Sequence, residues 1–474
     1  MSPCCHAHHP VAAARDRARR RRLPAGRYLG ILASQPPSDV QEHPSMTQHF
    51  ETRQIHAGAA PDPTTNAVVT PIYQTTSFVF DSAQHAADLF SLAQPGNIYT
   101  RITNPTTAVL EARLASLEGG SGALALASGQ SAETFAVLNI AGAGDHIVSS
   151  TSIYGGTYNL FKYTLAKLGI ETTFIEDQND PEAWRAAARP NTKLFFAETI
   201  GNPAVNILDI EPVAAVAHDV GVPLVVDNTV ATPYLIRPIE HGADIVVHSA
   251  TKYLGGHGAV VGGVIVDGGT FPWSQHVDRF PGLTEPDPSY DGLSYTTALG
   301  DANAFHLKAR VQLLRDIGPS IAPASAWQIL QGVETLSLRV ERHVQNAKRV
   351  AEWLESNERV ASVNYAGLPS SPWHELANHY APLGAGAILS FELKGGVDAG
   401  RRLIESVALF SHLVNIGDVR SLISHPASTT HSQLTPEQLL SGGITPGLVR
   451  LSIGLEHVDD IIGDLDQAFA KVFA

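Results

Sequence analysis

Cysteine and methionine are almost absent from this chain of 474 residues. Its two cysteines are Cys4 and Cys5, and its two methionines are Met1 and Met46. From Met46 onward the sequence therefore excludes disulfides, thiolate metal sites and cysteine nucleophiles. No apolar run reaches the roughly 18 residues that a membrane span requires. We expect a protein that neither crosses a membrane nor depends on cysteine chemistry.

Residues 1–45 differ in composition from everything that follows. They contain both cysteines, the basic run ARDRARRRRLPAG and a tail rich in proline and serine. A basic run can be a targeting peptide or a nucleic-acid arm, but no apolar stretch of signal-peptide length follows it. Because Met46 is a natural alternative start, we interpret residues 1–45 as a disordered or non-native extension that is dispensable.

Acidic residues outnumber basic ones, and the chain has a net charge of −14. Seven arginines and three acidic residues fall in residues 1–45, so the remainder carries −18. An acidic body disfavours nucleic acids and anionic membranes as partners. Length and a hydrophobic content of 44% predict a soluble cytoplasmic protein of two or more domains.

The most informative stretch is DIVVHSATKYLGGHG, residues 244–258. It predicts a short buried strand, after which Lys252 precedes a loop that contains three glycines. A lone lysine is usually a solvated surface amine. Between an apolar strand and a glycine loop, burial lowers the pKa of the amine and makes it a nucleophile toward a carbonyl. This context predicts a lysine that forms a Schiff base.

A second predicted strand, PLVVDN at residues 223–228, ends on Asp227. The 15 residues between the two strands suffice for a parallel crossover, and the carboxyl ends of parallel strands face one crevice. Asp227 is also a plausible turn or helix-cap residue. Beside Lys252 it can pair with a cationic ring nitrogen. The two strand ends together favour pyridoxal phosphate (PLP), whose protein partners are a lysine and an acid.

These motifs, together with the strings NIGDVRSLISHPASTTHSQL and TPGLVRLSIGLEHVDD, resemble the Cys/Met metabolism family of PLP-dependent enzymes. The resemblance runs from about Met46 to the end of the chain. It implies an α/β protein of the PLP-dependent transferase fold (fold type I, aspartate aminotransferase-like), with a mostly parallel central sheet and a smaller C-terminal α/β domain. We predict an N-terminal arm at residues 46–103, a PLP-binding domain at 104–312 and a C-terminal domain at 313–474.

A glycine turn between a strand and a helix is the candidate phosphate site. The strand GALALAS runs into Gly129 and Gln130 at a helix start, where free N–H groups point outward. An ordinary βα turn has the same pattern. The resemblance implies that the backbones of Gly129 and Gln130 and the hydroxyls of Ser249 and Thr251 hold the PLP phosphate.

Tyr154, Asn202 and Arg450 take their roles from the resemblance. It implies that Tyr154 stacks on the PLP ring and contacts the substrate, although a core tyrosine would look the same in the sequence. Asn202, which could merely shape the turn before a proline, would donate to the ring hydroxyl oxygen. Arg450 is flanked by apolar residues, so either a protein carboxylate or a ligand carboxylate must satisfy it. The family uses this arginine to bind the substrate carboxylate.

Residues 46–103 contain the prolines and glycines of an arm. Tyr99 and Arg101 alternate on it and so point to one face, as an ordinary surface pair would. The resemblance implies that they cross a dimer interface to the neighbouring subunit's PLP phosphate, with Tyr99 also touching the substrate. We therefore predict a homo-oligomer, a dimer with shared active sites that assembles into a tetramer.

The implied reaction is a γ-replacement in which sulfide, or methanethiol, displaces acetate from O-acetyl-L-homoserine. Lys252, Tyr154 and Asp227 would be the catalytic residues, and sulfide would give L-homocysteine for methionine biosynthesis. Asp418 and Arg420 replace small or acidic residues of cystathionine-forming relatives, which favours sulfide over cysteine. Cystathionine γ-synthase, a γ-lyase and a non-catalytic PLP-binding scaffold are the alternatives.

Two further features complete the sequence. The histidines, His425 and His431 included, show no metal-ligand spacing with acids or cysteines, so no metal is expected. Residues 268–297 are rich in proline, glycine and aromatic residues without periodicity. They predict a long ordered loop or a lid.

Overall fold

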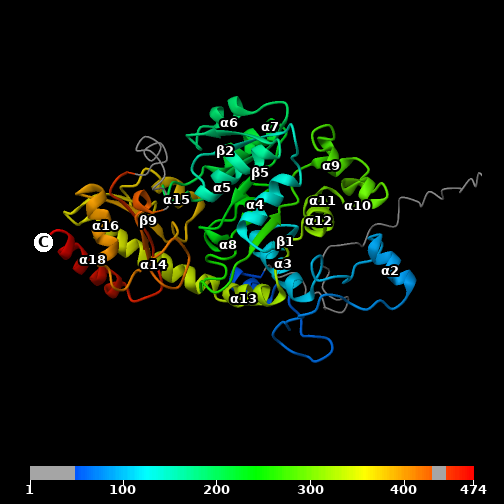
Figure 1. Ribbon diagram of the computed structural model, residues 1–474, viewed down its shortest axis with the longest axis horizontal. Helices are drawn as coiled ribbons and strands as arrows, with labels where there is room; N and C mark the ends of the chain where they lie inside the picture. The colour runs from blue at the N-terminus through cyan, green and yellow to red at the C-terminus, as the bar shows by residue number, and fades with distance from the viewer. Residues whose placement is uncertain (1–47, 430–444) are drawn as a thin grey trace, which may run out of the picture.

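The computed structural model describes residues 48–429 and 445–474. Within these ranges the chain forms a seven-stranded and a five-stranded sheet, and the long helix α14 (Leu336–Glu355) runs along the second sheet toward the first (Figure 1). The predicted extension at residues 1–45, the start at Met46 and His431 lie outside the described residues. No helix in the described ranges is long and apolar enough to span a membrane.

The larger sheet has the order β1-β7-β6-β5-β4-β2-β3. Its strands are β1 (Gly122–Leu126), β2 (His146–Ser150), β3 (Glu171–Ile175), β4 (Thr192–Glu198), β5 (Leu224–Asp227), β6 (Ile245–His248) and β7 (Gly263–Asp267). Both pairs that involve β7 are antiparallel, and the other four are parallel. The prediction of a mostly parallel central sheet is therefore confirmed.

Helices cover both faces of this sheet, as parallel sheets require. On one face lie α3 (Pro105–Glu118), α6 (Pro181–Ala187), α7 (Ile210–Asp219) and α8 (Thr232–Leu235), and on the other α4 (Gly129–Leu138), η1 (Leu160–Leu165) and α11 (Asp301–Lys308). Successive residues of β5 alternate between two hydrophobic clusters: Leu224 and Val226 belong to one and Val225 to the other. The continuous apolar runs of these strands follow from burial on both sides.

Helix α3 begins and ends where its sequence predicts. The Asn104 side chain accepts a hydrogen bond from the Thr106 N–H at 3.0 Å, and Gly119 ends the helix with φ of 80°. A left-handed residue is favourable there only as glycine or asparagine. The apolar stripe of the helix, which includes Leu110 and Leu114, is fully buried.

Residues 268–297 are folded into the core. They form the short helices η3 (Trp273–Gln275), α9 (Pro281–Thr284), η4 (Pro288–Tyr290) and α10 (Tyr295–Leu299). Trp273, Phe280 and Tyr295 are buried, and the Trp273 ring stacks on Phe305 at a centroid distance of 5.6 Å. Its buried aromatic residues anchor the segment, so it is an ordered part of the fold.

The smaller sheet has the order β10-β11-β12-β9-β8. Its strands are β8 (Val360–Asn364), β9 (Ile388–Leu393), β10 (Ser411–His412), β11 (Leu422–Ser424) and β12 (Leu448–Ser452). Around them lie α14, α15 (His374–Tyr380), α16 (Gly396–Ser406) and α18 (Val458–Val472). Helix α13 (Pro323–Val333) packs on α3, so contacts with the first sheet's helices continue past the predicted boundary at 313. The smaller C-terminal α/β unit is as predicted.

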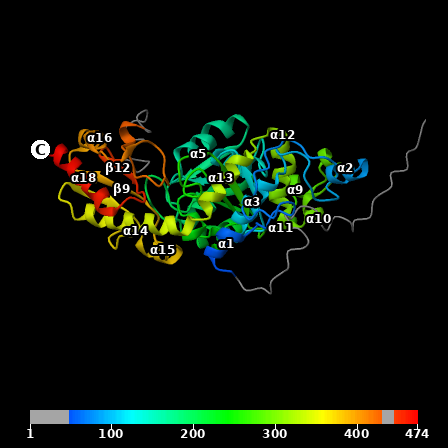
Figure 2. The same ribbon diagram turned by 90° about the horizontal axis from the view of Figure 1, so that it is seen from below.

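In its described residues, 48–103, the N-terminal arm contains two helices, α1 (Phe50–His56) and α2 (Ala83–Phe90). Helix α2 lies at the end of the molecule opposite α18 in both views (Figures 1 and 2). Between the helices, Val68 is 83% exposed and Val79 is 95% exposed. Such apolar exposure on an extended segment is typical of a surface that another chain covers.

Candidate active site

Parallel strands bring the predicted lysine and aspartate to one edge of the sheet. Asp227 is the last residue of β5 and pairs with Val247 of β6, the strand that precedes Lys252. Glu198 ends the next strand, β4, and pairs with Asp227. The strand-to-lysine geometry inferred from the sequence is present.

Lys252 lies in a partly buried position and donates a hydrogen bond from Nζ to Asn415 Oδ1. Burial lowers its pKa below the usual 10.5, and the positive charge of Arg450 lowers it further. A larger fraction of the amine is therefore neutral near pH 7 than in a solvated lysine. This is the chemical state in which an amine attacks a carbonyl carbon.

Arg450 is a buried cation that pairs with no carboxylate of residues 48–429 and 445–474. It is 9% exposed on β12, where Nη1 donates to Asn202 Oδ1 at 3.1 Å and Nη2 to the Asn415 carbonyl oxygen at 3.4 Å. In the described part of the chain its Nε has no partner, and it forms no ion pair. Burial lowers its pKa to about 10. The guanidinium is satisfied if a ligand brings a carboxylate.

Three buried carboxylates lie close together near the ends of β4 and β5. Asp227, Glu133 and Glu198 are 7%, 4% and 4% exposed. Burial raises the pKa of all three, and the charge of Asp227 raises the pKa of the two glutamates further. Among the described residues no lysine or arginine forms an ion pair with them. A cationic ring nitrogen beside Asp227 would supply the missing positive charge.

The predicted phosphate loop is shaped by close backbone packing. Helix α4 begins at Gly129, and a Cβ there would lie 2.7 Å from the Cβ of Ser249. Only glycine allows this approach of the helix start to the residue after β6. The Gln130 side chain donates to Glu133 Oε2 at 2.7 Å, and the Thr251 hydroxyl donates to the Gly262 carbonyl at 3.2 Å. Thus Gly129, Gln130 and Ser249 are brought together, while Thr251 bonds its own loop.

The backbone of Tyr154 is hydrogen-bonded to one of the three buried carboxylates, Glu198. Its N–H donates to Glu198 Oε1 at 2.6 Å, and its side chain is half-exposed. The ring lies over Gly156, where a Cβ would approach Cε1 to 2.4 Å. Glycine at this position is therefore needed for the orientation of the ring.

Tyr99 and Arg101 are not part of the group within one chain. Tyr99 is 42% exposed and forms a β-bridge with Ser77, and the Arg101 guanidinium lies 5.5 Å from the Tyr99 ring centroid. In the described residues neither makes a hydrogen bond to the lysine site. Both side chains are exposed, and the contact with a neighbouring subunit that the resemblance implies stays a prediction.

Glu133, Glu198 and Asn415 were not predicted from the sequence. The strand-end position that predicted Asp227 also applies to Glu198, because Glu198 ends the adjacent parallel strand. Asn415 stands in the segment NIGDVRSL, where Asp418 and Arg420 were singled out instead.

Asp418 and Arg420 form an ion pair of 2.9 Å with each other. A Cβ at Gly258 would lie 2.2 Å from the Asp418 carboxylate, and the Val419 N–H donates to the Gly256 carbonyl at 2.9 Å. The segment therefore packs along the lysine loop, but its two charges neutralise each other.

The residues fit the three chemically distinct parts of PLP. Lys252 suits its aldehyde, the acid cluster its ring nitrogen, and the α4 start beside Ser249 its phosphate. On the α/β fold described above, they define a PLP-dependent enzyme. The chain belongs to the Cys/Met metabolism PLP-dependent enzymes, whose family model matches residues 51–470.

Relatives match the chain over most of its length. It is 55% identical to the O-acetyl-L-homoserine sulfhydrylase of Leptospira meyeri, over 90% of this chain and 98% of the relative. It is 50% identical to the homocysteine synthase of Schizosaccharomyces pombe, over 90% and 99%. A solved O-acetylhomoserine (thiol)-lyase of Campylobacter jejuni, which carries a pyridoxyl-lysine monophosphate, superposes with a TM-score of 0.86 at 41% identity and covers 89% of this chain and all of that one.

Proposed function

We propose that this enzyme catalyses γ-replacement on O-acetyl-L-homoserine, with sulfide as acceptor and L-homocysteine and acetate as products. Arg450 carries the proposal, since it is a buried guanidinium without a carboxylate partner among the described residues and hydrogen-bonds the same Asn415 as Lys252. An α-carboxylate held there places the amino acid's α-carbon near the lysine. The names of the relatives supply the substrate class.

PLP, when bound, supplies the electron sink for bond changes at the substrate's Cα, Cβ and Cγ. Arg450 holds the α-carboxylate, and Asp227 keeps the ring nitrogen protonated. Lys252 Nζ would take the Cα proton and pass it to the bound PLP, which frees the amine to take a Cβ proton, and the C–O bond at Cγ would then break as acetate leaves with its electron pair. After hydrosulfide forms the C–S bond at Cγ, Lys252 returns the two protons to carbon.

Charge pairing favours sulfide over cysteine as the acceptor. Cysteine would bring a second carboxylate into the site, but Arg450 already serves the first substrate and Arg420 is paired with Asp418. Arg339, which also packs on the lysine loop, donates its Nη groups to the carbonyls of Tyr253, Leu254 and Gly332. A site that leaves a charged group unpaired rejects that substrate by about 10²-fold or more.

Two parts of the proposal concern assembly and location. The exposed Tyr99 and Arg101 and the apolar exposure of the arm support a homodimer with shared active sites, which pairs further into a tetramer. The cytoplasmic location expected from the sequence is also a proposal.

The test is a comparison of kcat/KM for sulfide and for cysteine with O-acetylhomoserine, at saturating PLP. We expect sulfide to exceed cysteine by about 10²-fold. Equal use of the two acceptors would favour the cystathionine γ-synthase alternative. A PLP-loaded enzyme without turnover would favour the scaffold, and O-succinylhomoserine in parallel tests the acyl group.

A further inference from the structure

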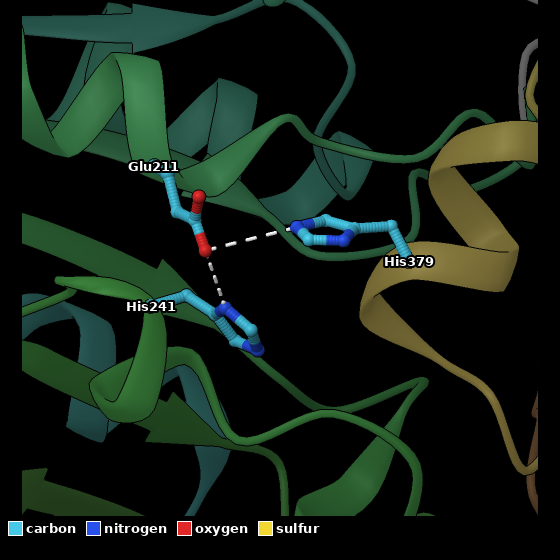
Figure 3. Close-up of side chains that lie close together, drawn as sticks. All are labelled: Glu211, His241 and His379. Atoms are coloured by element: carbon cyan, nitrogen blue, oxygen red, sulfur yellow. Dashed lines mark hydrogen bonds and ion pairs between the residues drawn. The ribbon is translucent and has the colours of Figure 1, made fainter.

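A carboxylate and two imidazoles converge away from the lysine site. Glu211 lies in the first turn of α7, His241 at the end of η2 (Pro238–His241), and His379 in the last turn of α15. Figure 3 shows the two rings directed at one Glu211 oxygen. Glu211 Oε1 lies 2.9 Å from His241 Nδ1 and 3.7 Å from His379 Nε2, and the candidate ligand atoms all lie within 4.8 Å of one another.

The backbone around this group is held in place by Tyr380. Its buried hydroxyl donates to Asp209 Oδ1 at 2.5 Å and accepts from the Glu211 N–H at 3.2 Å. Its ring meets the His241 ring edge-on at a centroid distance of 4.9 Å. The residue next to His379 thus fixes α15 against the start of α7, so that the three side chains converge from a rigid frame.

The arrangement matches the ligand chemistry of zinc. Two imidazole nitrogens and one carboxylate oxygen are a common zinc set, and bond lengths of 2.0–2.1 Å place tetrahedral ligands about 3.3 Å apart. The observed 2.9 Å and 3.7 Å lie on either side of that value. A hydrogen bond to Glu211 explains the position of the His241 ring, whereas His379 Nε2 is too far from Glu211 Oε1 for a hydrogen bond. Small side-chain rotations would bring all three atoms to bonding distance.

We propose that Glu211, His241 and His379 bind a divalent transition-metal ion of the zinc type. Water completes the coordination, since two of the three side chains are more than half-exposed. His241 and His379 also line a cavity of about 190 Å³, which leaves room for that water. Because His379 belongs to the chain segment of the smaller sheet and the other two ligands to that of the larger sheet, the ion ties the two units together.

The experiment is calorimetric titration of the tag-free, PLP-loaded, chelator-treated full chain with zinc chloride. Five ligand-type residues near the N-terminus are first replaced by serine in every sample: Cys4, Cys5, His6, His8 and His9. We expect this background to bind one zinc ion at the group. His379→Ala and His241→Ala should each weaken that binding by at least about tenfold. His56→Ala, an exposed histidine of α1, is the matched control and should bind as the background does.

Two further readouts keep the proposal open to refutation. Zinc should raise the Tm of the background protein and leave that of His379→Ala unchanged, because only a site that includes both units stabilises their contact. Magnesium, which prefers oxygen ligands, should not bind. Equal zinc affinity in the background, His379→Ala and His56→Ala samples would overturn the site. If zinc binding weakens in His241→Ala but not in His379→Ala, the ion does not bridge the two units.

Discussion

At the scale of single residues, the site depends on charges that are buried before any ligand arrives. Among the described residues, Arg450 pairs with no carboxylate and Asp227 with no lysine or arginine, although both are more than nine-tenths buried. Unpaired buried charges destabilise a fold unless a partner is supplied. The carboxylate of an amino-acid substrate would pair with Arg450, and a cationic ring nitrogen would pair with Asp227. Ligand binding would therefore remove the destabilisation that the unpaired buried charges cause.

Borohydride reduction of the PLP-loaded enzyme should attach a pyridoxyl group to Lys252, and Lys252→Ala should abolish both adduct and turnover. Peptide mass spectrometry locates the adduct. Lys308 is an internal control, since burial lowers its pKa to about 8 but its Nζ donates to the Asn139 carbonyl at 2.8 Å. An adduct on Lys308 would show that a low pKa, and not the strand-end position, selects the lysine.

Arg450→Ala should lower kcat/KM for O-acetylhomoserine by about 10²–10³-fold, chiefly through KM. Loss of one partner of a buried charge pair costs about 2–5 kcal/mol. Arg450→Lys should recover part of the loss, because it restores the charge without the planar fork. The control is Arg402→Ala, an exposed arginine of α16. Steady-state kinetics that leave KM unchanged in Arg450→Ala would exclude the carboxylate role.

At the scale of elements, the site is assembled where β4, β5 and β6 end and where β12 of the second sheet approaches them. The hydrogen bond between Arg450 and Asn202 joins β12 of the second sheet to the loop that follows β4. Asp227, Ser249, Lys252, Asn202 and Arg450 belong to this junction, and Gly129 and Gln130 belong to the α4 start. Tyr154 follows β2, Thr251 bonds the Gly262 carbonyl, and the Tyr99–Arg101 pair lies on the arm. The arm is the one element whose predicted function requires another chain.

Mixing two inactive variants tests the shared site. Arg101→Ala and Lys252→Ala should each be inactive, and hybrid dimers should regain part of the activity because one of their two active sites combines an intact arm with an intact lysine. Activity is measured after subunit exchange, which native mass spectrometry verifies. A mixture of two differently tagged Lys252→Ala samples is the control. Exchange without recovery would contradict the shared site.

At the scale of the whole molecule, packing between α14 and the second sheet buries a titratable ring. His343 is fully buried, and its Nδ1 donates to the Ile453 carbonyl at 2.6 Å. Burial lowers the pKa of the imidazole to about 4. Between about pH 6.5 and 4 the His343 imidazole therefore binds a proton in the unfolded chain but stays neutral in the folded chain.

This predicts a fall in the free energy of unfolding as pH drops from about 6.5 to 4. One buried histidine accounts for up to about 3 kcal/mol at the lower end, since each pKa unit is worth 1.36 kcal/mol. His343→Asn keeps a donor for the Ile453 carbonyl but does not titrate, so its stability should depend less on pH. Urea unfolding of both PLP-loaded proteins at pH 7, 6 and 5 measures the difference. Parallel pH profiles would assign the acid sensitivity to other groups.

The sequence by itself determined the local features of the structure, which depend on residues that are neighbours along the chain. Strand alternation, the caps of α3 and the positions of Asp227 and Lys252 at strand ends are local patterns, and the parallel crossover joins the two ends by geometry alone. The tertiary structure decided which distant side chains meet. Glu133 beside Asp227, Asn415 between Lys252 and Arg450, and the convergence of Glu211 and His241 on His379 have no common period or spacing. Their contacts arise from packing between elements that are far apart in the sequence, and local sequence patterns do not predict such packing.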